Sequence, residues 1–495
     1  MSGEKAIVRS RWSSDRSEDL FQVFNPATGE TLRMVQGASP MEAQKAVEAA
    51  HRAFETDWRL RSPTQRAAIL LKAADALEEH ADELATCLSQ ENGKPFRDAR
   101  PADVNFLVQV FRYFGGLIDK LPSEFYDQGS IYATVVREPF GVVLGIIPFN
   151  WPPIHTGGKL APALAAGNTV VLKPGEQAPL TVIRIVEILN TVFPKDVIHV
   201  VPAKGIAVPQ ALISNQLVRK ISFTGSTAGG AAVGQSALAR VTPVVLELGG
   251  KNAFIVFEDA NIHDAVQDAL EGGFYNKGEA CTAASRVLVH ESVHDEFVKQ
   301  LSTAVEKLKV GEGLLEDTHV GPVVSKIQQQ KVLKYLTVGA EEGATIAAQA
   351  PLPADLRLKN GFFVPPTLFT NVKRDMRIAK EEIFGPVVTV TKFTTYEEAI
   401  AITNESEYGL VCAVHTSDMN QAWRAARDVE SGIVFVNNYH RNALGTPFGG
   451  TKSSGFGREH CIETLHDYTW AKTVRIPSGR GEVPRWRGVQ DCFKN

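Results

Sequence analysis

The feature that most constrains the fold of this chain is a regular alternation that begins at Gly141. Short apolar runs such as GVVLGIIPF, GNTVVLKP and VRKISFTGS alternate with longer helical stretches such as APLTVIRIVEILNTVF. Such runs are typical of strands buried on both faces, and the stretches between them have the length of crossover helices. A second series follows Asn252, from AFIVFED to GIVFVNN. The pattern predicts two α/β domains, each with a parallel sheet covered by helices.

The rest of the chain departs from this alternation in two ways. Residues before Gly141 are mostly helical in pattern, and SPMEAQKAVEAAHRAF and SPTQRAAILLKAADALEEHADEL each begin with a serine cap and a proline. Glu42 and Gln65 occupy the third helical position, which predicts a capping box in both helices. The segments IYATVVREP and DYTWAKTVRIP alternate like half-buried strands outside any βαβ unit. We expect them to pair with each other or with another subunit.

Composition excludes several classes of protein. The chain of 495 residues is too long for one ordinary core, and its formal net charge of −4 indicates neither a nucleic-acid binder nor an acidic tail. The apolar run YATVVREPFGVVLGIIPFNWP is interrupted by Arg137 and Glu138, so no membrane span is predicted. The N-terminus lacks the apolar core of a secretory signal, and five scattered cysteines favour a reducing compartment. The expectations are a cytoplasmic location, a small-molecule partner and no metal site.

The segment FYNKGEACTAASR places one cysteine, Cys281, among small residues. A thiol needs a base or a positive field to become a nucleophilic thiolate, and no histidine is close in sequence. Glu279 lies two positions before it. A buried structural cysteine is the alternative interpretation. If Cys281 is catalytic, its helpers must come from elsewhere in the chain.

Two motifs are candidates for binding a dinucleotide. ISFTGSTAGG is a strand that runs into a glycine-rich turn, where backbone N–H groups can approach a pyrophosphate. Its spacing from Gly225 to Gly230 differs from the GxGxxG fingerprint, so a plain strand–helix turn is an alternative. VVLKPGE ends a predicted strand with Lys173 and Glu176, which either bind ribose hydroxyls or belong to a solvated turn.

Two further motifs place polar side chains at the ends of apolar strands. In IIPFNWPP, Asn150 is either an Asx-turn residue or an amide donor to a developing oxyanion. In VVLELGGKN, Glu247 stands within an apolar run. Burial would raise the pKa of this carboxyl toward the range of a general base.

Together these motifs resemble those of the aldehyde dehydrogenase superfamily. LELGGKNA and FYNKGEACTAAS match its two signature stretches, and PFNWP, LKPGE, FTGSTAGG, EEIFGPV and PFGGTKSSGFGRE match in family order. The resemblance covers the chain from about Phe21. It implies a Rossmann-like cofactor domain over residues 1–118 and 140–249 and a catalytic domain over 250–468. Residues 119–139 and 469–495 would form a small β-arm for oligomerisation into a homodimer or homotetramer.

The resemblance also implies roles for single residues. Cys281 corresponds to the nucleophile, Glu247 to the general base that activates water, and Asn150 to the oxyanion donor. Lys159 and Glu459 match positions that support proton movement. Glu279 stands where the family more often has Gln, and we expect it to shape the loop.

The implied cofactor is NAD, with NADP as an alternative, and the implied substrate is an aldehyde. Arg441 would lie at the substrate entrance, where it either pairs with a carboxylate, as in a semialdehyde, or points into solvent. The residues expected at the substrate are Trp151, His440, Arg441 and Phe448. Those expected at the cofactor are Ile146, Pro148, Phe149, Lys173, Glu176, Gly205, Phe223, Thr224, Gly225, Ser226, Leu248, Gly249, Glu382 and Phe384.

The implied reaction is oxidation of the aldehyde to a carboxylic acid through a thioester on Cys281, which water hydrolyses. One alternative is a CoA-acylating aldehyde dehydrogenase, which usually lacks the carboxylate found here at Glu247. Another is a non-catalytic structural or binding protein on the same fold, which would be expected to lose Cys281 or Glu247. A broad aliphatic or aromatic aldehyde and a semialdehyde both remain open as substrates.

Overall fold

The computed structural model describes residues 7–14, 16–439 and 443–493. A six-stranded sheet has the order β20-β10-β9-β6-β7-β8, and its strands from β10 to β8 are parallel, whereas β20 runs antiparallel to β10. The strands are β6 (Val142–Ile146), β7 (Thr169–Lys173), β8 (Ile198–Val200), β9 (Val218–Thr224), β10 (Val244–Glu247) and β20 (Gly455–Phe456).

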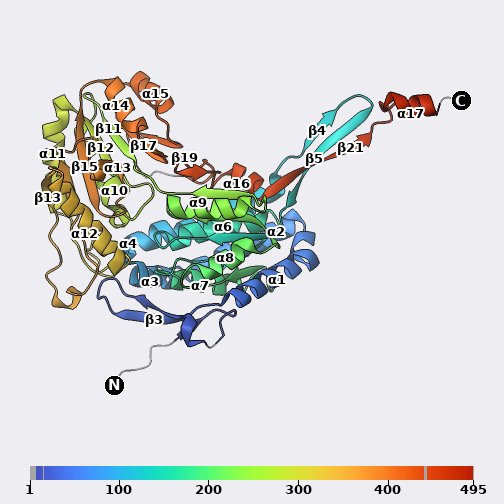
Figure 1. The fold of residues 1–495 in the computed structure, drawn as a ribbon, viewed down its shortest axis with the longest axis horizontal. Coiled ribbons are helices and arrows are strands. Elements are labelled where there is room, and N and C mark those ends of the chain that lie inside the picture. The colour runs from blue at the N-terminus through green and yellow to red at the C-terminus, as the bar shows by residue number, and fades with distance from the viewer. Residues whose placement is uncertain (1–6, 15, 440–442, 494–495) are drawn as a thin grey trace.

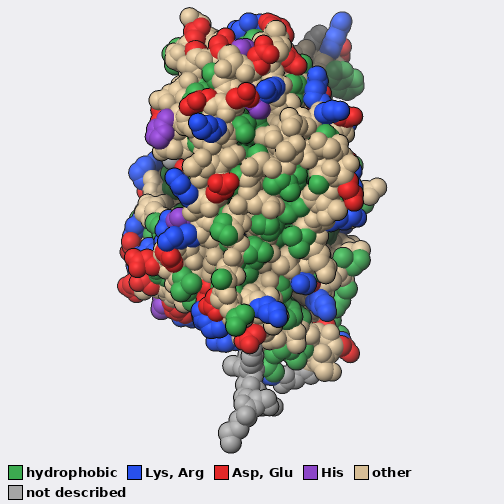
Figure 2. Space-filling view, turned by 90° about the vertical axis from the view of Figure 1, so that its left-hand side faces the viewer, with side chains coloured by type: hydrophobic (Ala, Val, Ile, Leu, Met, Phe, Trp, Pro, Cys, Tyr) green, Lys and Arg blue, Asp and Glu red, His purple; other side chains and the backbone are tan. Residues whose placement is uncertain are grey.

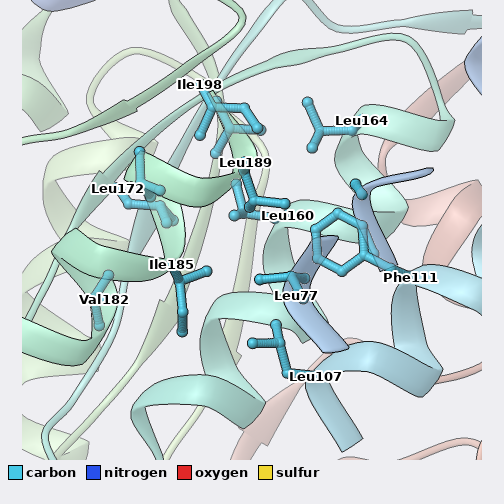
Figure 3. Close-up of a cluster of buried hydrophobic side chains, with 14 of the residues drawn as sticks. Leu77, Leu107, Phe111, Leu160, Leu164, Leu172, Val182, Ile185, Leu189 and Ile198 are labelled. Carbon is cyan, nitrogen blue, oxygen red and sulfur yellow. The ribbon is translucent and has the colours of Figure 1, made fainter. Parts of the chain in front are cut away.

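Helices cover both faces of this sheet because its strands bury side chains in both directions. Leu144 packs into a core with α1, α8 and α9, whereas the neighbouring Val143 packs into a second core with α2, α3, α5, α6 and α7. Leu77, Phe111 and Leu172 belong to this second core (Figure 3). The helices are α1 (Pro40–Thr56), α2 (Pro63–Glu79), α3 (Ala81–Asn92), α5 (Asn105–Leu117), α6 (Pro152–Ala165), α7 (Leu180–Leu189), α8 (Ala207–Ser214) and α9 (Thr227–Leu238).

A second sheet of seven strands has the order β13-β14-β15-β12-β11-β17-β18, parallel except for β13 at one edge. Phe254 packs into one core and Ile255 into the core on the opposite face. The strands are β11 (Ala253–Val256), β12 (Arg286–His290), β13 (Thr345–Gln349), β14 (Thr367–Thr370), β15 (Val387–Phe393), β17 (Val411–His415) and β18 (Ile433–Val436). The helices are α10 (Ile262–Phe274), α11 (Glu291–Glu306), α12 (Lys326–Glu341), α13 (Arg377–Lys380), α14 (Tyr396–Asn404) and α15 (Met419–Asp428). The two sheets confirm the predicted α/β class.

A three-stranded antiparallel sheet projects from the body as an arm (Figure 1). It consists of β4 (Glu124–Asp127), β5 (Ile131–Pro139) and β21 (Thr469–Pro477). β5 and β21 pair along their whole length, from Ile131 opposite Pro477 to Pro139 opposite Thr469. β5 and β21 correspond to the segments IYATVVREP and DYTWAKTVRIP, which were predicted to lie outside the βαβ units. The two segments pair with each other.

The remaining elements are short. β1 (Ile7–Arg9), β2 (Leu20–Phe24) and β3 (Thr31–Gln36) form a small sheet near the N-terminus, and β16 (Tyr408–Gly409) pairs with β19 (Thr451–Lys452). The short helices include α4 (Phe96–Asp98), α16 (Ile462–Asp467) and α17 (Arg487–Cys492). α17 follows the arm near the C-terminus (Figure 1).

Charges are mixed on the face shown in Figure 2, where acidic and basic side chains are interspersed around neutral and hydrophobic ones. This agrees with the small net charge and differs from the basic stripe of a nucleic-acid binder. Within the described residues, no helix combines the length and apolarity needed to cross a membrane.

Both predicted helix starts have the expected capping box. The Ser39 hydroxyl accepts a hydrogen bond from the backbone N–H of Glu42, and the Glu42 carboxylate accepts one from the backbone N–H of Ser39. Ser62 and Gln65 repeat the arrangement at the start of α2. These side chains satisfy N–H groups that a helix leaves unpaired in its first turn.

Replacing Ser39 by Ala should therefore lower the free energy of unfolding by about 1 kcal/mol, because the first turn of α1 loses its cap. The midpoint of urea denaturation measures this change. Ser39→Thr keeps the hydroxyl and is the matched control. If Ser39→Ala unfolds at the same urea concentration as the wild type, packing alone holds the start of α1.

Candidate functional site

The loop that carries Cys281 begins with an unusual backbone turn after α10. Asn276, Lys277 and Gly278 have φ angles of 49°, 63° and 64°, so three consecutive residues adopt the left-handed conformation. A Cβ atom on Gly278 would lie 2.2 Å from the carbonyl oxygen of Gly385. Only glycine fits this close approach, and the turn directs the following residues back toward the first sheet.

The side chain of Asn252 fixes the position of the Cys281 loop. Its amide nitrogen donates to the carbonyl oxygens of Cys281 (2.8 Å) and Ala283 (2.9 Å), and its amide oxygen accepts from the backbone N–H of Val411 (3.0 Å). The Tyr439 hydroxyl donates to the carbonyl of Thr282 at 2.7 Å. The loop is thus tied to the second sheet. Asn252 lies within the LELGGKNA motif, but its bridging role is not readable from the sequence.

A buried ion pair lies behind the same loop. Lys277 Nζ is 3.2 Å from Glu279 Oε2, and both side chains are fully buried. Glu279 Oε1 accepts from the backbone N–H of Val324 at 3.1 Å, and Lys277 donates to the side-chain oxygen of Asn92 at 2.6 Å. Burial raises the pKa of Glu279, and the charge of Lys277 opposes this shift. The Glu279 carboxylate therefore has its partners within and behind the loop.

The start of α6 packs against the Cys281 loop. Trp151 forms a small buried cluster with Ala280 and Ala283. Lys94 Nζ lies 3.6 Å from the centre of the Trp151 ring and 2.6 Å from Asp103 Oδ1. This arrangement brings the residues around Asn150 to Cys281.

Cys281 lines a cavity of about 190 Å³ together with Asn150 and nine of the residues predicted at the cofactor. Gln328 and Lys331, one turn apart on α12, line it too and were not predicted. In the sequence these two belong to a polar helical stretch that has the composition of a solvated face. The predicted lining residues are Pro148, Phe149, Asn150, Thr224, Gly225, Ser226, Leu248, Gly249, Cys281, Glu382 and Phe384.

Burial and negative charge act together on the Cys281 thiol. Burial raises its pKa most, and the carboxylates of Glu247 and Glu382 raise it further. Cys281 is therefore a thiol in the free site, and its ionisation requires a base or an added positive charge.

Glu247 ends β10 and lies opposite Gly455 of β20. It is 3% exposed, and its Oε1 atom has no hydrogen-bond partner in the described chain. A Cβ atom on Gly449 would lie 2.8 Å from that oxygen, so the glycine leaves room for it. Burial raises the pKa of Glu247 well above its usual value, and the charge of Glu459 adds to the shift.

Lys159 and Glu459 form an ion pair near Glu247. Lys159 Nζ lies 2.8 Å from Glu459 Oε1 and donates to the Ser222 hydroxyl at 3.0 Å. Burial alone would raise the pKa of Glu459, but Lys159 together with His460 and His155 lowers it to about 2. The two carboxyls thus differ in charge, since Glu459 is ionised and Glu247 holds its proton more tightly.

Asn150 is 3% exposed and lines the Cys281 cavity. Its backbone carbonyl accepts from the side chain of Asn276 at 3.0 Å, which connects it to the left-handed turn. Its side-chain oxygen has no partner in the described chain. A hydrogen bond to its backbone therefore holds Asn150 in place, and the side-chain amide is available to a ligand in the cavity.

The residues predicted to bind adenosine lie at neighbouring strand ends. Ile146 at the end of β6 pairs with Lys173 at the end of β7. Glu176 Oε1 accepts from the backbone N–H of Gly205 at 2.8 Å, and Gly205 has a φ of 72°. Burial lowers the pKa of Lys173, and Glu176 opposes this.

The glycine-rich turn connects β9 to the N-terminus of α9. A Cβ atom on Gly225 would lie 2.7 Å from the Phe223 ring, so a side chain does not fit there. Ser226 caps α9 by accepting from the backbone N–H of Gly229 at 3.1 Å. The buried hydroxyl of Thr224 has no partner in the described chain. An uncovered backbone, a helix N-terminus and a free hydroxyl together suit a phosphate group.

Glu382 and Phe384 line the same cavity as Cys281. Glu382 Oε1 accepts from the backbone N–H of Gly250 at 2.9 Å. The Phe384 ring meets Phe149 edge-on at 5.9 Å. Phe384 has a φ of 58°, a strained conformation for an aromatic residue, and its carbonyl accepts from Gln328 at 2.5 Å.

Of the residues predicted at the substrate, His440 and Arg441 lie outside the described residues. Phe448 exchanges backbone hydrogen bonds with Glu459 at 3.0 and 2.7 Å. It lines a second cavity of about 160 Å³ together with Phe106 and His460, neither of which was predicted.

Comparison with known proteins agrees with this geometry. The sequence profile of the aldehyde dehydrogenase family matches residues 12–474. Aldehyde dehydrogenase citD of Monascus ruber is 57% identical over 489 residues, which are 99% of this chain and 97% of that protein. Betaine aldehyde dehydrogenase of Bacillus subtilis is 38% identical and covers 94% of this chain and 96% of its own length.

A solved structure of betaine aldehyde dehydrogenase from Staphylococcus aureus in complex with NAD+ has a TM-score of 0.91 at 38% identity. The match covers 96% of this chain and 94% of that one. With its signature motifs gathered around one half-buried cysteine, the chain belongs to the aldehyde dehydrogenase family.

Proposed function

We propose that this protein oxidises an aldehyde to the carboxylic acid, with Cys281 as nucleophile, Glu247 as general base and Asn150 as oxyanion donor. One observation carries the proposal: a half-buried thiol meets a buried carboxylate and a buried amide near one cavity. Glu247 and Asn150 each keep a side-chain oxygen without a partner in the described chain. A buried polar atom without a partner costs folding free energy, and groups that carry this cost are concentrated at catalytic sites.

In the first half of the reaction, Cys281 Sγ attacks the aldehyde carbon. Ionised Glu247, whose charge acts on this thiol, accepts the thiol proton. A C–S bond forms and the carbonyl oxygen becomes an oxyanion, which the Asn150 amide and the backbone N–H of Cys281 stabilise. The product of this step is a thiohemiacetal.

The residues at the strand ends fit a nicotinamide dinucleotide. Glu176 would hold the adenosine ribose, the turn at Gly225 and Ser226 the phosphates, and Glu382 with Phe384 the nicotinamide ribose. The NAD+ complex of the Staphylococcus aureus relative supports this choice of cofactor. Bound NAD+ supplies the acceptor for the hydride that leaves the substrate carbon, and that loss turns the thiohemiacetal into a thioester.

Before the second half, Glu247 passes on the proton it took from the thiol. It then removes a proton from water, and the resulting hydroxide attacks the thioester carbon. The C–S bond breaks, the Cys281 thiolate leaves and the carboxylic acid is released. Glu247 must then pass on the proton it gained. Glu459 and Lys159 form a charged pair beside it and are our candidates for the first step of that transfer.

The alternatives explain fewer features of the site. A CoA-acylating enzyme transfers the acyl group to a thiol and has no use for a water-activating base, yet Glu247 is present and buried. A non-catalytic protein on the same fold has no use for a reactive cysteine beside a buried carboxylate. Hydrolysis by a Glu247-activated water accounts for both residues.

We also assign the projecting arm to oligomerisation into a homodimer or homotetramer. Phe125, Tyr126 and Ile476 on the arm are exposed, and hollows of about 520 and 610 Å³ lie at its root. Trp470 and Phe140 line both hollows. Exposed apolar side chains next to a concave surface suit a second copy of the chain.

For the domain limits we propose the ranges expected from the sequence, with β20 (Gly455–Phe456) of the 250–468 range joining the first sheet. We keep residues 1–118 and 140–249 as the cofactor domain, 250–468 as the catalytic domain, and 119–139 and 469–495 as the arm. The five cysteines are free thiols, which supports a cytoplasmic location.

Cys281→Ala should abolish aldehyde oxidation and leave NAD+ binding intact, because the thiol is the nucleophile and the small alanine side chain leaves the dinucleotide residues of the cavity in place. NADH absorbance measures turnover, and titration of protein fluorescence measures NAD+ binding. Cys87→Ala, which removes a partly buried cysteine on α3, is the control and should keep wild-type turnover. Substantial turnover in Cys281→Ala would remove this residue from its role.

Glu247→Gln should lower the steady-state rate by roughly 10²–10⁴-fold, because the amide keeps the shape but takes no proton. In the wild type the base acts when ionised and its pKa is raised, so the rate should increase as pH rises through that raised pKa. The variant should lose this increase. Glu48→Gln, on the exposed side of α1, should keep the wild-type profile. An unchanged rate in Glu247→Gln would contradict the general-base assignment.

The cofactor preference should be NAD over NADP, because the Glu176 charge repels a 2′-phosphate. Glu176→Gln keeps an acceptor for the Gly205 N–H but removes the charge, so it should raise kcat/KM for NADP relative to NAD. The two cofactors are compared at one aldehyde concentration. A wild-type preference for NADP would refute this assignment.

A further inference from the structure

A group of polar atoms without partners surrounds the first turns of α6. In the described chain, both ring nitrogens of His155 and the Nδ1 atom of His460 are buried without a hydrogen-bond partner. Buried polar atoms are paired in the great majority of cases, and an unpaired one costs about 1–3 kcal/mol. The chemistry proposed above uses neither histidine, so these atoms call for another explanation.

His155 lies on the part of α6 that faces the reaction centre. It is one helical turn before Lys159 and one turn after Trp151, and residues at this spacing share a helix face. The neighbouring Ile154 packs against the cluster of Trp151, Ala280 and Ala283 beside Cys281. His155 is 6% exposed and within electrostatic reach of Lys159 and Glu459.

The His460 ring reaches the same region from the other side. It meets Phe106 edge-on at 4.9 Å and Phe448 at 5.5 Å, and it lines the cavity of about 160 Å³. A Cβ atom on Gly158 would lie 2.8 Å from His460 Cε1, so the absence of a side chain at Gly158 makes room for the ring. The His460 ring therefore meets α6 at Gly158, one helical turn from His155, and the two imidazoles influence each other electrostatically.

The backbone of His460 is strained in a way that favours a functional interpretation. Its φ is 68°, a left-handed conformation that is costly for a bulky side chain. The backbone N–H of Gly445 donates to its carbonyl at 2.8 Å and helps to hold this conformation. The strained backbone places the ring on the cavity wall between two aromatic side chains.

The charge state of the two imidazoles limits what they bind. Burial lowers the pKa of His155 to about 3, and the charge of Lys159 lowers it further. Burial also lowers the pKa of His460. A neutral imidazole carries one N–H donor and one acceptor nitrogen, so it pairs with a hydroxyl and gives a carboxylate no counter-charge.

From these contacts we infer that His155 and His460 are specificity-determining residues for an aromatic aldehyde that carries a neutral hydroxyl group. The free ring nitrogens would exchange hydrogen bonds with the hydroxyl. The Phe106 and Phe448 rings would pack on the aromatic ring of the substrate, since aromatic rings favour edge-on and offset contacts. The inference rests on the proposed function, because it names the substrate class of that same site.

The test compares kcat/KM for benzaldehyde, its three hydroxy isomers and 4-carboxybenzaldehyde, with NAD+ as cofactor. In the wild type, at least one hydroxy isomer should exceed benzaldehyde by about tenfold, as two hydrogen bonds of ordinary strength would give. The carboxylated aldehyde should fall below benzaldehyde. In His155→Leu the advantage of the hydroxyl should disappear, whereas kcat/KM for benzaldehyde should change by less than about threefold.

Two further variants separate hydrogen bonding from structure. His460→Asn tolerates the left-handed backbone and keeps a donor and an acceptor, so it should retain part of the hydroxyl preference. His263→Leu removes an exposed histidine on α10 and should behave as the wild type. A ratio of hydroxy isomer to benzaldehyde that is equal in the wild type and in His155→Leu would overturn the inference, and so would a preference for the carboxylated aldehyde.

Failure of the proposed function would be visible separately, as absence of turnover with every aldehyde including benzaldehyde. In that case the binding of the aldehydes, measured without turnover, tests the inference. In Cys281→Ala, the preferred hydroxy isomer should bind about tenfold more tightly than benzaldehyde by calorimetry. Adding His155→Leu should remove that difference. Equal binding of the two aldehydes to Cys281→Ala would overturn the inference whatever the turnover.

Discussion

The short link between the two parallel sheets is the constraint on which the active site depends. Glu247 is the last residue of β10 in one sheet, and Ala253 is the first residue of β11 in the other. Five residues separate them, and the last of these, Asn252, holds the carbonyl of Cys281. The same link therefore fixes the carboxylate and the loop of the thiol. Gly250 allows this approach, because a Cβ atom there would lie 2.4 Å from the Cys281 carbonyl oxygen.

Buried charge is the second recurring feature, and it divides the polar groups of the site into two kinds. Moving an ion from water into the interior is costly, and a close partner offsets the cost only when hydrogen bonds complete the pairing. Three lysine–carboxylate pairs around the site offset part of this cost and hold the surrounding elements together. Among the atoms left without a partner in the described chain, Glu247 Oε1 and Asn150 Oδ1 belong to the proposed reaction centre. The pairs are Lys94–Asp103, Lys159–Glu459 and Lys277–Glu279.

The sequence predicts a feature well when residues close together in the chain determine it. It predicts poorly the features that depend on packing between distant segments. The two parallel sheets and both capping boxes come from local patterns, and the structure has them. The family's ordered motifs, confirmed by the comparisons, brought together residues as distant as Asn150 and Glu382. Gln328 was missed because it stands in a polar helical stretch and meets the cavity only through the packing of α12. His460 was missed because no local pattern in the sequence indicates its left-handed backbone or its place at the second cavity.

The position of one lysine decides which carboxyl of the site holds a proton. Glu247 and Glu459 are both buried and interact, so ionising one opposes ionising the other. Lys159 contacts Glu459 at 2.8 Å and keeps it charged, and that charge raises the pKa of Glu247 further. Lys159 is the largest of the charge effects that oppose burial at Glu459, and His460 and His155 add to it. A base with a raised pKa holds an accepted proton more firmly, which suits Glu247 for taking one from water.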